Sequence, residues 1–387
     1  MSRTPARRLW LRLHRWLGLG VGAWLLLLGL TGSWLVFYPT LDAWLDPAQR
    51  QAVGRNAPIT AWEPVLQALK AAEPQRPRGW RIELPPDGRG LITARYLRPE
   101  EQPPGTFFAP LLVTVDPATG QAVARHTWGG TVGTWLYNLH FSLLAGEPGV
   151  WWVGWAGVLM SVSLLSGLVL WWPRSPGQWR QAWTRKLGAA RPRRTWDWHR
   201  LTGLYASPLL LVLALTGTLL AWPQYLDPLV ARLGPAPALP KPRSELPAPG
   251  TPPLTLDLAL ATVQQAFPQA HIRWVDTPDG PQGVFRFRLA LPGDPSERFA
   301  HSLVWVDAWR PQVLAAVTLD EWPAAATAQG WLHALHNGEA GGLAGRWAVL
   351  ALGLLPTVLA WTGLRRWRDR RRGEREAAAR RTAGLRS

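Results

Sequence analysis

Histidine is the residue type in this chain best suited to bind a transition metal, because its 387 residues include no cysteine and only two methionines. Two histidines, His14 and His199, occupy matched positions in a duplicated sequence, L-H-R-W-L-G-L (13–19) and W-H-R-L-T-G-L (198–204). Paired imidazoles at equal depth on related helices are what a metal site between facing helices of a bundle requires. The alternative is that duplication copied a structural residue.

A second matched pair is formed by His140 and His336, in W-L-Y-N-L-H (135–140) and W-L-H-A-L-H (331–336). On the later copy His333 lies three residues before His336, on the same helical face, so either could be a ligand. The register of the repeat pairs His336 with His140. We therefore rank His336 first and leave His333 as a reserve ligand, a proton donor or a surface residue.

Haem is the cofactor that best fits paired imidazoles in an apolar setting without thiolate or carboxylate neighbours. Zinc takes four ligands, and copper sites usually recruit cysteine or methionine. The sequence predicts two haem groups of the b type, one held by His14 and His199 and the other by His140 and His336.

Glycines Gly18 and Gly203 lie four residues after His14 and His199, on the same helical face. Small residues there would leave room for a porphyrin plane. The alternative, equally compatible with the sequence, is that they let two helices approach closely. We expect Thr31-Gly32 and Thr216-Gly217, deeper in the same apolar runs, to serve helix packing.

Four apolar runs, each long enough to cross a bilayer, carry these residues. Of the 42 Lys and Arg residues, 23 lie in the short segments 1–15, 173–200 and 364–387 that flank these runs. This is the distribution of an inner-membrane protein with both termini in the cytoplasm, and it argues against nucleic-acid binding despite the net charge of +17. Arg12, Arg15 and Arg200 could also pair with haem propionates, although topology already explains them.

Two polar stretches between the runs show the same order of a short amphipathic helix, two strands and a hairpin. The predicted fold is a four-helix transmembrane bundle from two repeated halves, each with an inserted small α+β periplasmic module. The first apolar run, about 17–37, is expected to be retained and not cleaved as a signal peptide. The predicted segments are 1–39 (first span), 40–130 (first module), 131–173 (second span), 174–198 (basic loop), 199–223 (third span), 224–253 (proline-rich linker), 254–325 (second module), 326–364 (fourth span) and 365–387 (basic tail).

These motifs resemble the PepSY-associated transmembrane helix family of bacterial inner-membrane proteins over nearly the whole chain. The resemblance rests on the two histidine motifs with their L-T-G sequences, the L-H pairs, and the V-T-V-D-P-A-T-G turn (113–120). It implies a ferric-siderophore reductase that carries haem between paired histidines. The second module has V-D-A-W-R-P (306–311) where the first has its V-D-P-A-T-G turn, so a shared ligand role for the two turns is not expected.

The expected function is electron transfer through haem to a periplasmic ferric complex, with the lipid bilayer as surroundings and a quinol or a cytoplasmic reductase as electron donor. The rival is a non-enzymatic membrane protein whose PepSY-like modules bind or regulate a periplasmic partner such as a protease. The rival hypothesis does not require the matched histidines.

Overall fold

The computed structural model describes residues 5–53, 58–102 and 107–384, which divide into two compact units. The first unit comprises Met1–Val36, Leu139–Trp222 and Leu335–Ser387, and the second comprises Phe37–Asn138 and Pro223–Ala334. Each unit therefore draws on both halves of the sequence repeat.

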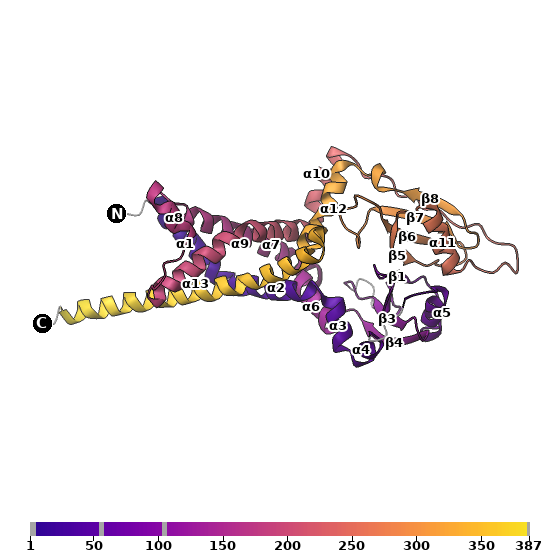
Figure 1. Ribbon diagram of the computed structural model, residues 1–387, viewed down its shortest axis with the longest axis horizontal. Coiled ribbons are helices and arrows are strands. Elements are labelled where there is room, and N and C mark those ends of the chain that lie inside the picture. Colours follow the sequence, from indigo (N-terminus) through magenta and orange to yellow (C-terminus); the bar gives the residue numbers. More distant parts are fainter. Residues whose placement is uncertain (1–4, 54–57, 103–106, 385–387) are drawn as a thin grey trace. The chain divides into compact units, whose positions relative to one another are not determined.

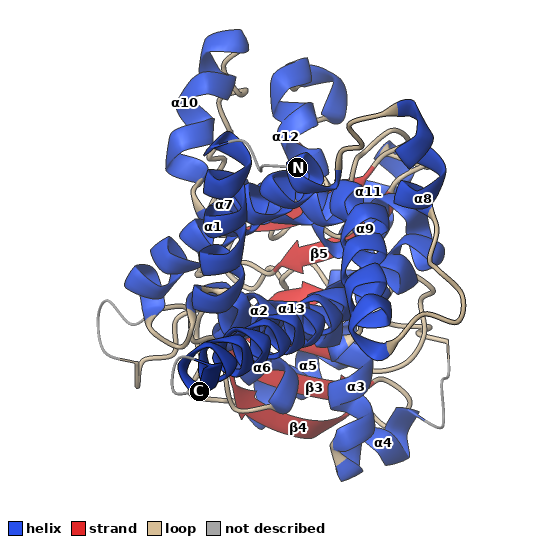
Figure 2. Ribbon diagram, turned by 90° about the vertical axis from the view of Figure 1, so that its left-hand side faces the viewer, coloured by secondary structure: helices blue, strands red, loops and turns tan. Residues whose placement is uncertain are grey.

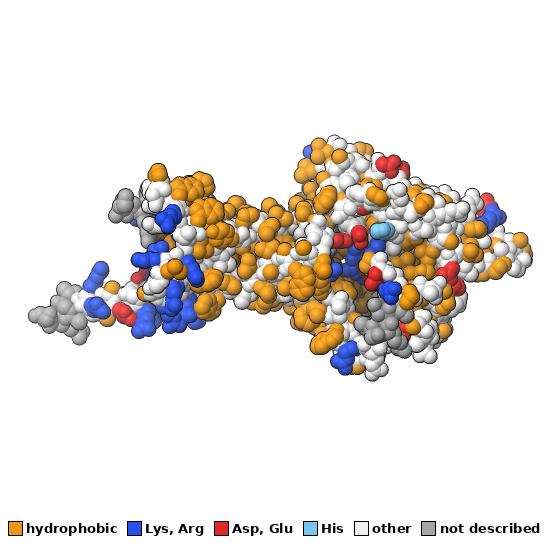
Figure 3. Space-filling model, in the orientation of Figure 1, with side chains coloured by type: hydrophobic (Ala, Val, Ile, Leu, Met, Phe, Trp, Pro, Cys, Tyr) orange, Lys and Arg blue, Asp and Glu red, His pale blue; other side chains and the backbone are white. Residues whose placement is uncertain are grey.

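The first unit is a set of long helices that lie side by side (Figure 1). Helix α7 packs against α9, and α13 packs against both α2 and α9. Figure 3 shows apolar side chains over these helices and Lys and Arg side chains gathered at the end where the termini lie. The helices are α1 (Pro5–Gly20), α2 (Gly22–Leu35), α7 (Gly146–Trp171), α9 (Arg191–Ala221) and α13 (Gly342–Gly384).

Among the described residues, three helices are long and apolar enough to span a membrane, and there are four spans if α1 and α2 count as one. These two helices meet at an angle of 57°. The sequence predicted one continuous run over 17–37, but Gly20 and Gly22 flank the junction at Val21. Glycine weakens a helix because it loses more backbone conformational entropy than other residues when the helix forms. The chain is a membrane protein with several helical spans.

The second unit contains a single antiparallel sheet of eight strands, in the order β4-β3-β2-β1-β5-β6-β7-β8, seen as red arrows in Figure 2. The two predicted modules are thus not separate sheets. Their first strands pair with each other, so that Arg81 lies opposite Asp276 and Ile82 opposite Val275. The strands are β1 (Arg81–Glu83), β2 (Ile92–Tyr96), β3 (Leu111–Asp116), β4 (Gln121–Thr127), β5 (His271–Asp276), β6 (Val284–Ala290), β7 (Ser302–Asp307) and β8 (Val313–Val317).

Helices α5 (Glu63–Ala72) and α11 (Leu256–Ala266) cover one face of this sheet, and their apolar side chains share one core with the strands. Each helix caps the other. The Asp257 carboxylate accepts hydrogen bonds from the backbone N–H of Trp62 at 2.7 Å and of Glu63 at 2.9 Å. In return, Glu63 accepts from the N–H of Leu256 at 2.7 Å. These charged caps satisfy helix N–H groups that have no partner within their own helix.

The segment between His140 and the second span differs in detail from expectation. The sequence G-E-P-G at residues 146–149 is typical of a helix break, but these residues form the first turn of α7, where proline is tolerated. The break lies just before, at Leu143 and Leu144, whose φ angles are +50° and +59°. The remaining helices are α3 (Tyr38–Leu45), α4 (Pro47–Val53), α6 (Val132–Ser142), α8 (Trp179–Trp183), α10 (Pro223–Leu233) and α12 (Ala324–Asn337), with 3-10 turns at Pro176–Gln178, Leu319–Glu321 and Glu339–Gly341.

Turns in both hairpins are built the same way despite their different sequences. The Asp116 carboxylate accepts a hydrogen bond from the N–H of Ala118, and the Asp307 carboxylate accepts from those of Trp309 and Arg310. An aspartate that bonds the backbone two residues on is a usual turn former. Residues 234–255, which include most of the predicted proline-rich linker, form neither helix nor strand.

Candidate functional site

The first histidine pair, His14 and His199, comes together within the first unit. His14 lies on α1 and His199 on α9. Their ring centroids are 6.1 Å apart and the ring planes make an angle of 74°. Residues 185 positions apart in the sequence thus face each other across two helices.

The second histidine pair, His140 and His336, has nearly the same separation. His140 is near the end of α6 and His336 near the end of α12. Their ring centroids are 6.2 Å apart and the planes make an angle of 49°. The structure therefore pairs the four histidines as the sequence register predicted.

These separations can be compared with that of two imidazoles that share a metal ion. A metal–imidazole nitrogen bond is about 2.0–2.1 Å long, and the nitrogen lies about 1.1 Å from the ring centre, so two opposed rings have centroids about 6.3 Å apart. The observed 6.1 and 6.2 Å fit this value. Among the described residues, no three His, Asp or Glu side chains gather as ligands. Paired axial imidazoles are the protein's share of a haem site, where the porphyrin supplies the other four nitrogens.

Each of the four histidines has its Nδ1 atom next to a hydroxyl group on a neighbouring helix. Such a contact orients an imidazole and selects its tautomer. The Nδ1–Oγ distances are 2.9 Å for His14 and Ser166, 2.9 Å for His199 and Thr362, 3.0 Å for His140 and Thr31, and 3.1 Å for His336 and Thr216.

The direction of these hydrogen bonds follows from what the hydroxyl groups do with their own hydrogen atoms. Each donates to a carbonyl oxygen one turn earlier in its helix, such as Thr31 to Leu27 at 2.8 Å and Thr362 to Val358 at 2.7 Å. Ser166 and Thr216 do the same. The hydroxyl oxygen is then an acceptor, Nδ1 carries the proton, and Nε2 keeps the lone pair that a metal requires.

A glycine follows every one of these hydroxyl residues, and a histidine ring lies against it. A β-carbon at this position would clash with the ring at Gly217, would be tight at Gly32 and Gly167, and would come close to ordinary contact at Gly363. A β-carbon would lie 3.2 Å from Cε1 of the histidine at Gly167, 3.4 Å at Gly363, 3.0 Å at Gly32 and 2.8 Å at Gly217. A hydroxyl–glycine dipeptide therefore forms one support for each imidazole.

Each histidine of one pair lies on the same helix as a support of the other pair, or on the helix next to it in sequence. In the first pair the histidines lie on α1 and α9, and their supports lie on α7 and α13. In the second pair the supports lie on α2 and α9, and the histidines belong to the helices that precede α7 and α13. Sequence analysis assigned Thr31-Gly32 and Thr216-Gly217 to helix packing and did not single out Ser166-Gly167 or Thr362-Gly363. The recurrence of a hydroxyl residue before glycine in all four apolar runs was the available signal.

Gly18 and Gly203 lie on an open part of the helix surface. A β-carbon at Gly18 would meet no described atom within 4 Å, and at Gly203 the nearest atom is Cδ2 of Leu359 at 3.7 Å. Neither glycine makes the close helix contact that was one interpretation of the sequence. Space for a planar group beside His14 and His199 stays a prediction.

Arg200, His333 and His301 have local partners. The guanidinium of Arg200 donates to the carbonyl oxygens of Gln181 at 2.7 Å and Thr184 at 2.6 Å. The ring of His333 lies against Phe299, with centroids 4.2 Å apart. His301 bonds the Asp294 carboxylate at 3.0 Å. None of these contacts forms a third pair of imidazoles.

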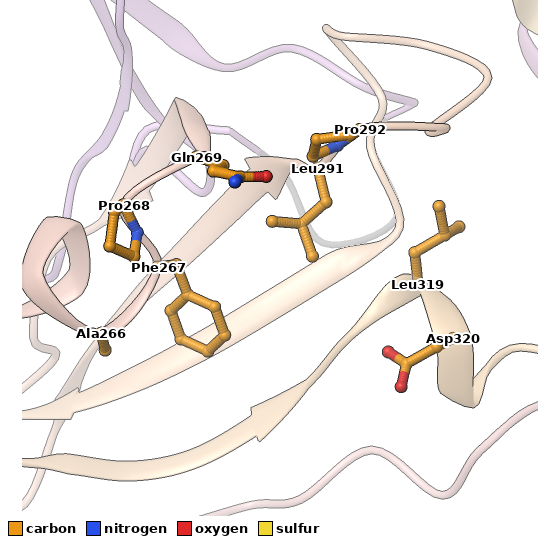
Figure 4. Close-up of a pocket in the computed structure, with 8 residues that line it drawn as sticks. All are labelled: Ala266, Phe267, Pro268, Gln269, Leu291, Pro292, Leu319 and Asp320. Carbon is orange, nitrogen blue, oxygen red and sulfur yellow. The ribbon is translucent and has the colours of Figure 1, made fainter.

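A pocket in the second unit, drawn in Figure 4, lies between the end of α11 and the segments that follow β6 and β8. Its lining is mostly apolar, and Asp320 is the one charged residue among the eight that line it. The carboxylate of Asp320 accepts a hydrogen bond from Thr318. The pocket offers no set of groups for acid–base or metal chemistry.

Comparison with known families agrees with the sequence motifs. The model of the PepSY-associated TM region matches residues 11–370, and the chain belongs to this family. No curated protein matches the chain.

Proposed function

We propose that this protein carries electrons across the membrane through two haem b groups and reduces ferric complexes, such as ferric siderophores, on the periplasmic side. The observation that carries the proposal is the separation of the paired rings, 6.1 and 6.2 Å. Family membership supports a membrane protein and leaves the chemistry to be argued from the histidines.

The chain's own residues would supply ligation and orientation. Nε2 of His14 and His199 would bind one haem iron, and Nε2 of His140 and His336 the other. The four hydroxyl groups keep the proton on Nδ1 and fix the ring planes, as outer partners of metal-bound histidines do. Bound haem supplies reversible one-electron transfer, and the apolar helices around the histidines limit access of water to it.

The location follows from charge. Basic residues flank the apolar helices at the N-terminus, in the connection between α7 and α9, and along the tail of α13. By the positive-inside rule, these segments would lie on the cytoplasmic side of a bacterial inner membrane. With this orientation a quinol or a cytoplasmic reductase donates electrons, and the acceptor is reached from the periplasm.

The first test is the visible absorption spectrum of the purified full-length protein after expression with ample haem. We expect the bands of a six-coordinate, bis-histidine haem, sharpened on reduction with dithionite. His271→Ala is a suitable control, because His271 is exposed at the start of β5 in the second unit. A protein that is folded, stable and free of haem bands would refute the proposal and favour a binding role for the sheet unit.

A second test addresses the acceptor. The protein is reduced under anaerobic conditions, excess reductant is removed, and ferric siderophores are added. Reoxidation of the haem bands together with formation of a ferrous chelate is the expected result. Haem that stays reduced with every ferric complex would limit the function to electron transfer between other partners.

A further inference from the structure

The face of the sheet opposite α5 and α11 carries a line of charged residues across its four central strands. Arg95 on β2 pairs in register with Arg81 on β1, Arg81 with Asp276 on β5, and Asp276 with Arg286 on β6. Residues that pair in register point to the same face. In β2 and β6 the apolar residues on either side of these arginines are buried in the core, which places the arginines on the opposite face.

One carboxylate holds two arginines in this line. Arg81 binds Asp276 through Nε at 2.6 Å and Nη2 at 3.0 Å, and Arg286 binds it through Nε at 2.9 Å. Burial alone would raise the pKa of Asp276, but the hydrogen bond from Arg81 and the charges of Arg81 and Arg286 hold this pKa below its ordinary value. The aspartate is therefore ionised, and one positive charge is left over.

Glu83 is the other carboxylate on this face and is also shared. Nε of Arg298 lies 2.7 Å from its Oε1, and Nη2 of Arg95 lies 3.5 Å from its Oε2. Nε of Arg95 is buried and has no hydrogen-bond partner among the described residues. A second positive charge is left over here.

Arg288 is not hydrogen-bonded to a carboxylate within the described chain, although the charges of Asp276 and Asp294 act on it. It pairs in register with Trp274 on β5, and within the described chain it forms neither a hydrogen bond nor an ion pair. Burial and the charges of Arg81 and Arg286 lower the pKa of Arg288, and the charges of Asp276 and Asp294 offset only part of this shift. We call the set of Arg81, Arg95, Arg286, Arg288 and Arg298 the arginine face; Asp276 and Glu83 are its two carboxylates.

The five guanidinium groups of the arginine face outnumber its two carboxylates and Asp294, which is shared with His301, and this excess of positive charge opposes folding. Arg81 and Arg95 lie directly opposite each other, and like charges in this position destabilise a sheet. The side chains of Arg81 and Arg286 keep exposed fractions of 31% and 39%, so a solute can reach them. An anion would neutralise the excess charge and use guanidinium donors that the protein leaves unpaired.

We propose that the arginine face binds a small anion with two or more carboxylate groups. The flat fork of arginine matches a carboxylate through two parallel hydrogen bonds. Four strands spaced about 4.8 Å apart place the outer arginines about 14 Å from each other, which suits a small chelate and not a polymer. The ligand class rests on the proposed function, since polycarboxylates bind ferric iron. The anion site itself stands without it.

The test is isothermal titration calorimetry on the full-length protein in detergent, with gallium(III) citrate as a redox-inert probe. Wild type is expected to bind it, and Arg288→Gln is expected to weaken binding about 10-fold or more, because a charged hydrogen bond is lost. Arg288→Lys, which keeps the charge without the fork, should fall between them. Arg310→Gln is the matched control, because Arg310 lies in the β7–β8 turn and pairs with the exposed Glu245.

Free citrate and inorganic phosphate form two further arms. Tighter binding of gallium citrate or citrate than of phosphate supports a carboxylate site, whereas tighter binding of phosphate overturns the ligand class. Equal binding by wild type and Arg288→Gln, both shown to be folded by near-ultraviolet circular dichroism, would overturn the site. Loss of haem bands in Arg288→Gln without loss of gallium citrate binding would also overturn it. None of these measurements requires electron transfer, so they can fail while the redox proposal holds, or the reverse.

Discussion

The first histidine pair, His14 and His199, and the second, His140 and His336, have almost equal separations although different kinds of helix carry them. The first pair lies on long helices of the first unit, and the second lies near the ends of the shorter α6 and α12. What they share is a hydroxyl–glycine support on a neighbouring helix. The same support therefore accompanies the imidazole on long and on short helices.

The pairs differ in how tightly they are held. At the two glycines of the first pair a β-carbon would lie 3.2 and 3.4 Å from the nearest ring atom, and at those of the second pair 3.0 and 2.8 Å. The angle between the ring planes is also smaller in the second pair, 49° against 74°. The second pair therefore tolerates less change around it.

The largest expected effect comes from removal of a ligand. His14→Ala should abolish the haem centre of the first pair and leave the second, and His336→Ala should do the opposite. Haem content per protein, with a redox titration to count the remaining centres, measures this. Unchanged haem content in both variants would refute the ligand assignment and with it the comparison of two sites.

Changes at the supporting glycines should separate the two pairs. Gly217→Ala puts a methyl group 2.8 Å from Cε1 of His336 and forces the ring to move, at a cost of about 1–3 kcal/mol for an overpacked site. Gly363→Ala, at 3.4 Å from His199, should cost less. Thermal unfolding and the reduced haem spectrum of both variants check this order. Equal effects would mean that the difference in tightness has no consequence.

Removal of a supporting hydroxyl should have a smaller effect. Thr362→Val and Thr216→Val keep the side-chain shape but remove the hydroxyl that accepts from Nδ1–H of His199 or His336, for about 1–2 kcal/mol. Nδ1 of His336 still lies 3.1 Å from the carbonyl oxygen of Leu213, so the loss in Thr216→Val should be partial. The midpoint potential of the affected haem should shift as well, because the hydroxyl tunes the ligand. Thr382→Val is the matched control, since the Thr382 hydroxyl donates to Ala378 of its own helix and has no histidine beside it in the part of the chain that the structure describes. A shift of the same size in the control would remove the special role of the supports.

The smallest expected effect is the change in thermal stability when Asp276 is titrated with acid. Asp276 lies in the second unit, outside both histidine pairs, and so serves as a reference. The folded-state pKa of Asp276 is held low, so its ion pairs stabilise the folded protein fully at pH values above its ordinary pKa of about 4. This contribution to stability is lost as the pH falls through the lowered pKa. Asp276→Asn should show a flatter loss of thermal stability over this acidic range. Glu245→Gln, an exposed residue, is the control. Curves that coincide for wild type and Asp276→Asn would contradict the ion-pair account.

The sequence contained enough to pair the histidines, because duplication placed His14 with His199 and His140 with His336 at constant offsets. The recurrence of a hydroxyl residue before glycine in the four apolar runs pointed to the supports, but it did not show which imidazole each would meet. Whether a threonine in an apolar helix meets an imidazole depends on the rotation of packed helices by a fraction of a turn. Thr362 shows the difficulty, since its neighbours in the sequence are all consistent with ordinary packing.

Sheet composition was predicted strand by strand, but the joining of the two modules was not. The β1–β5 pairing is formed between Arg81–Glu83 and His271–Asp276, which come from different copies of the repeat. Within its own module each of these strands is predicted to lie at the edge of the sheet. Nothing in the sequence of either strand indicates that it pairs with the other. The bend at Val21 was missed for a related reason, since glycines in an apolar run are compatible with both straight and broken helices.

The pairing of β1 with β5 also has an evolutionary consequence. Each histidine pair takes one residue from each half of the chain, and so does the centre of the sheet. A half-length chain could complete neither pair alone, but two identical copies related by a twofold axis could complete both at once. Fusion of two such copies into one chain would keep both histidine pairs and would free each half to change its own arginines and turns.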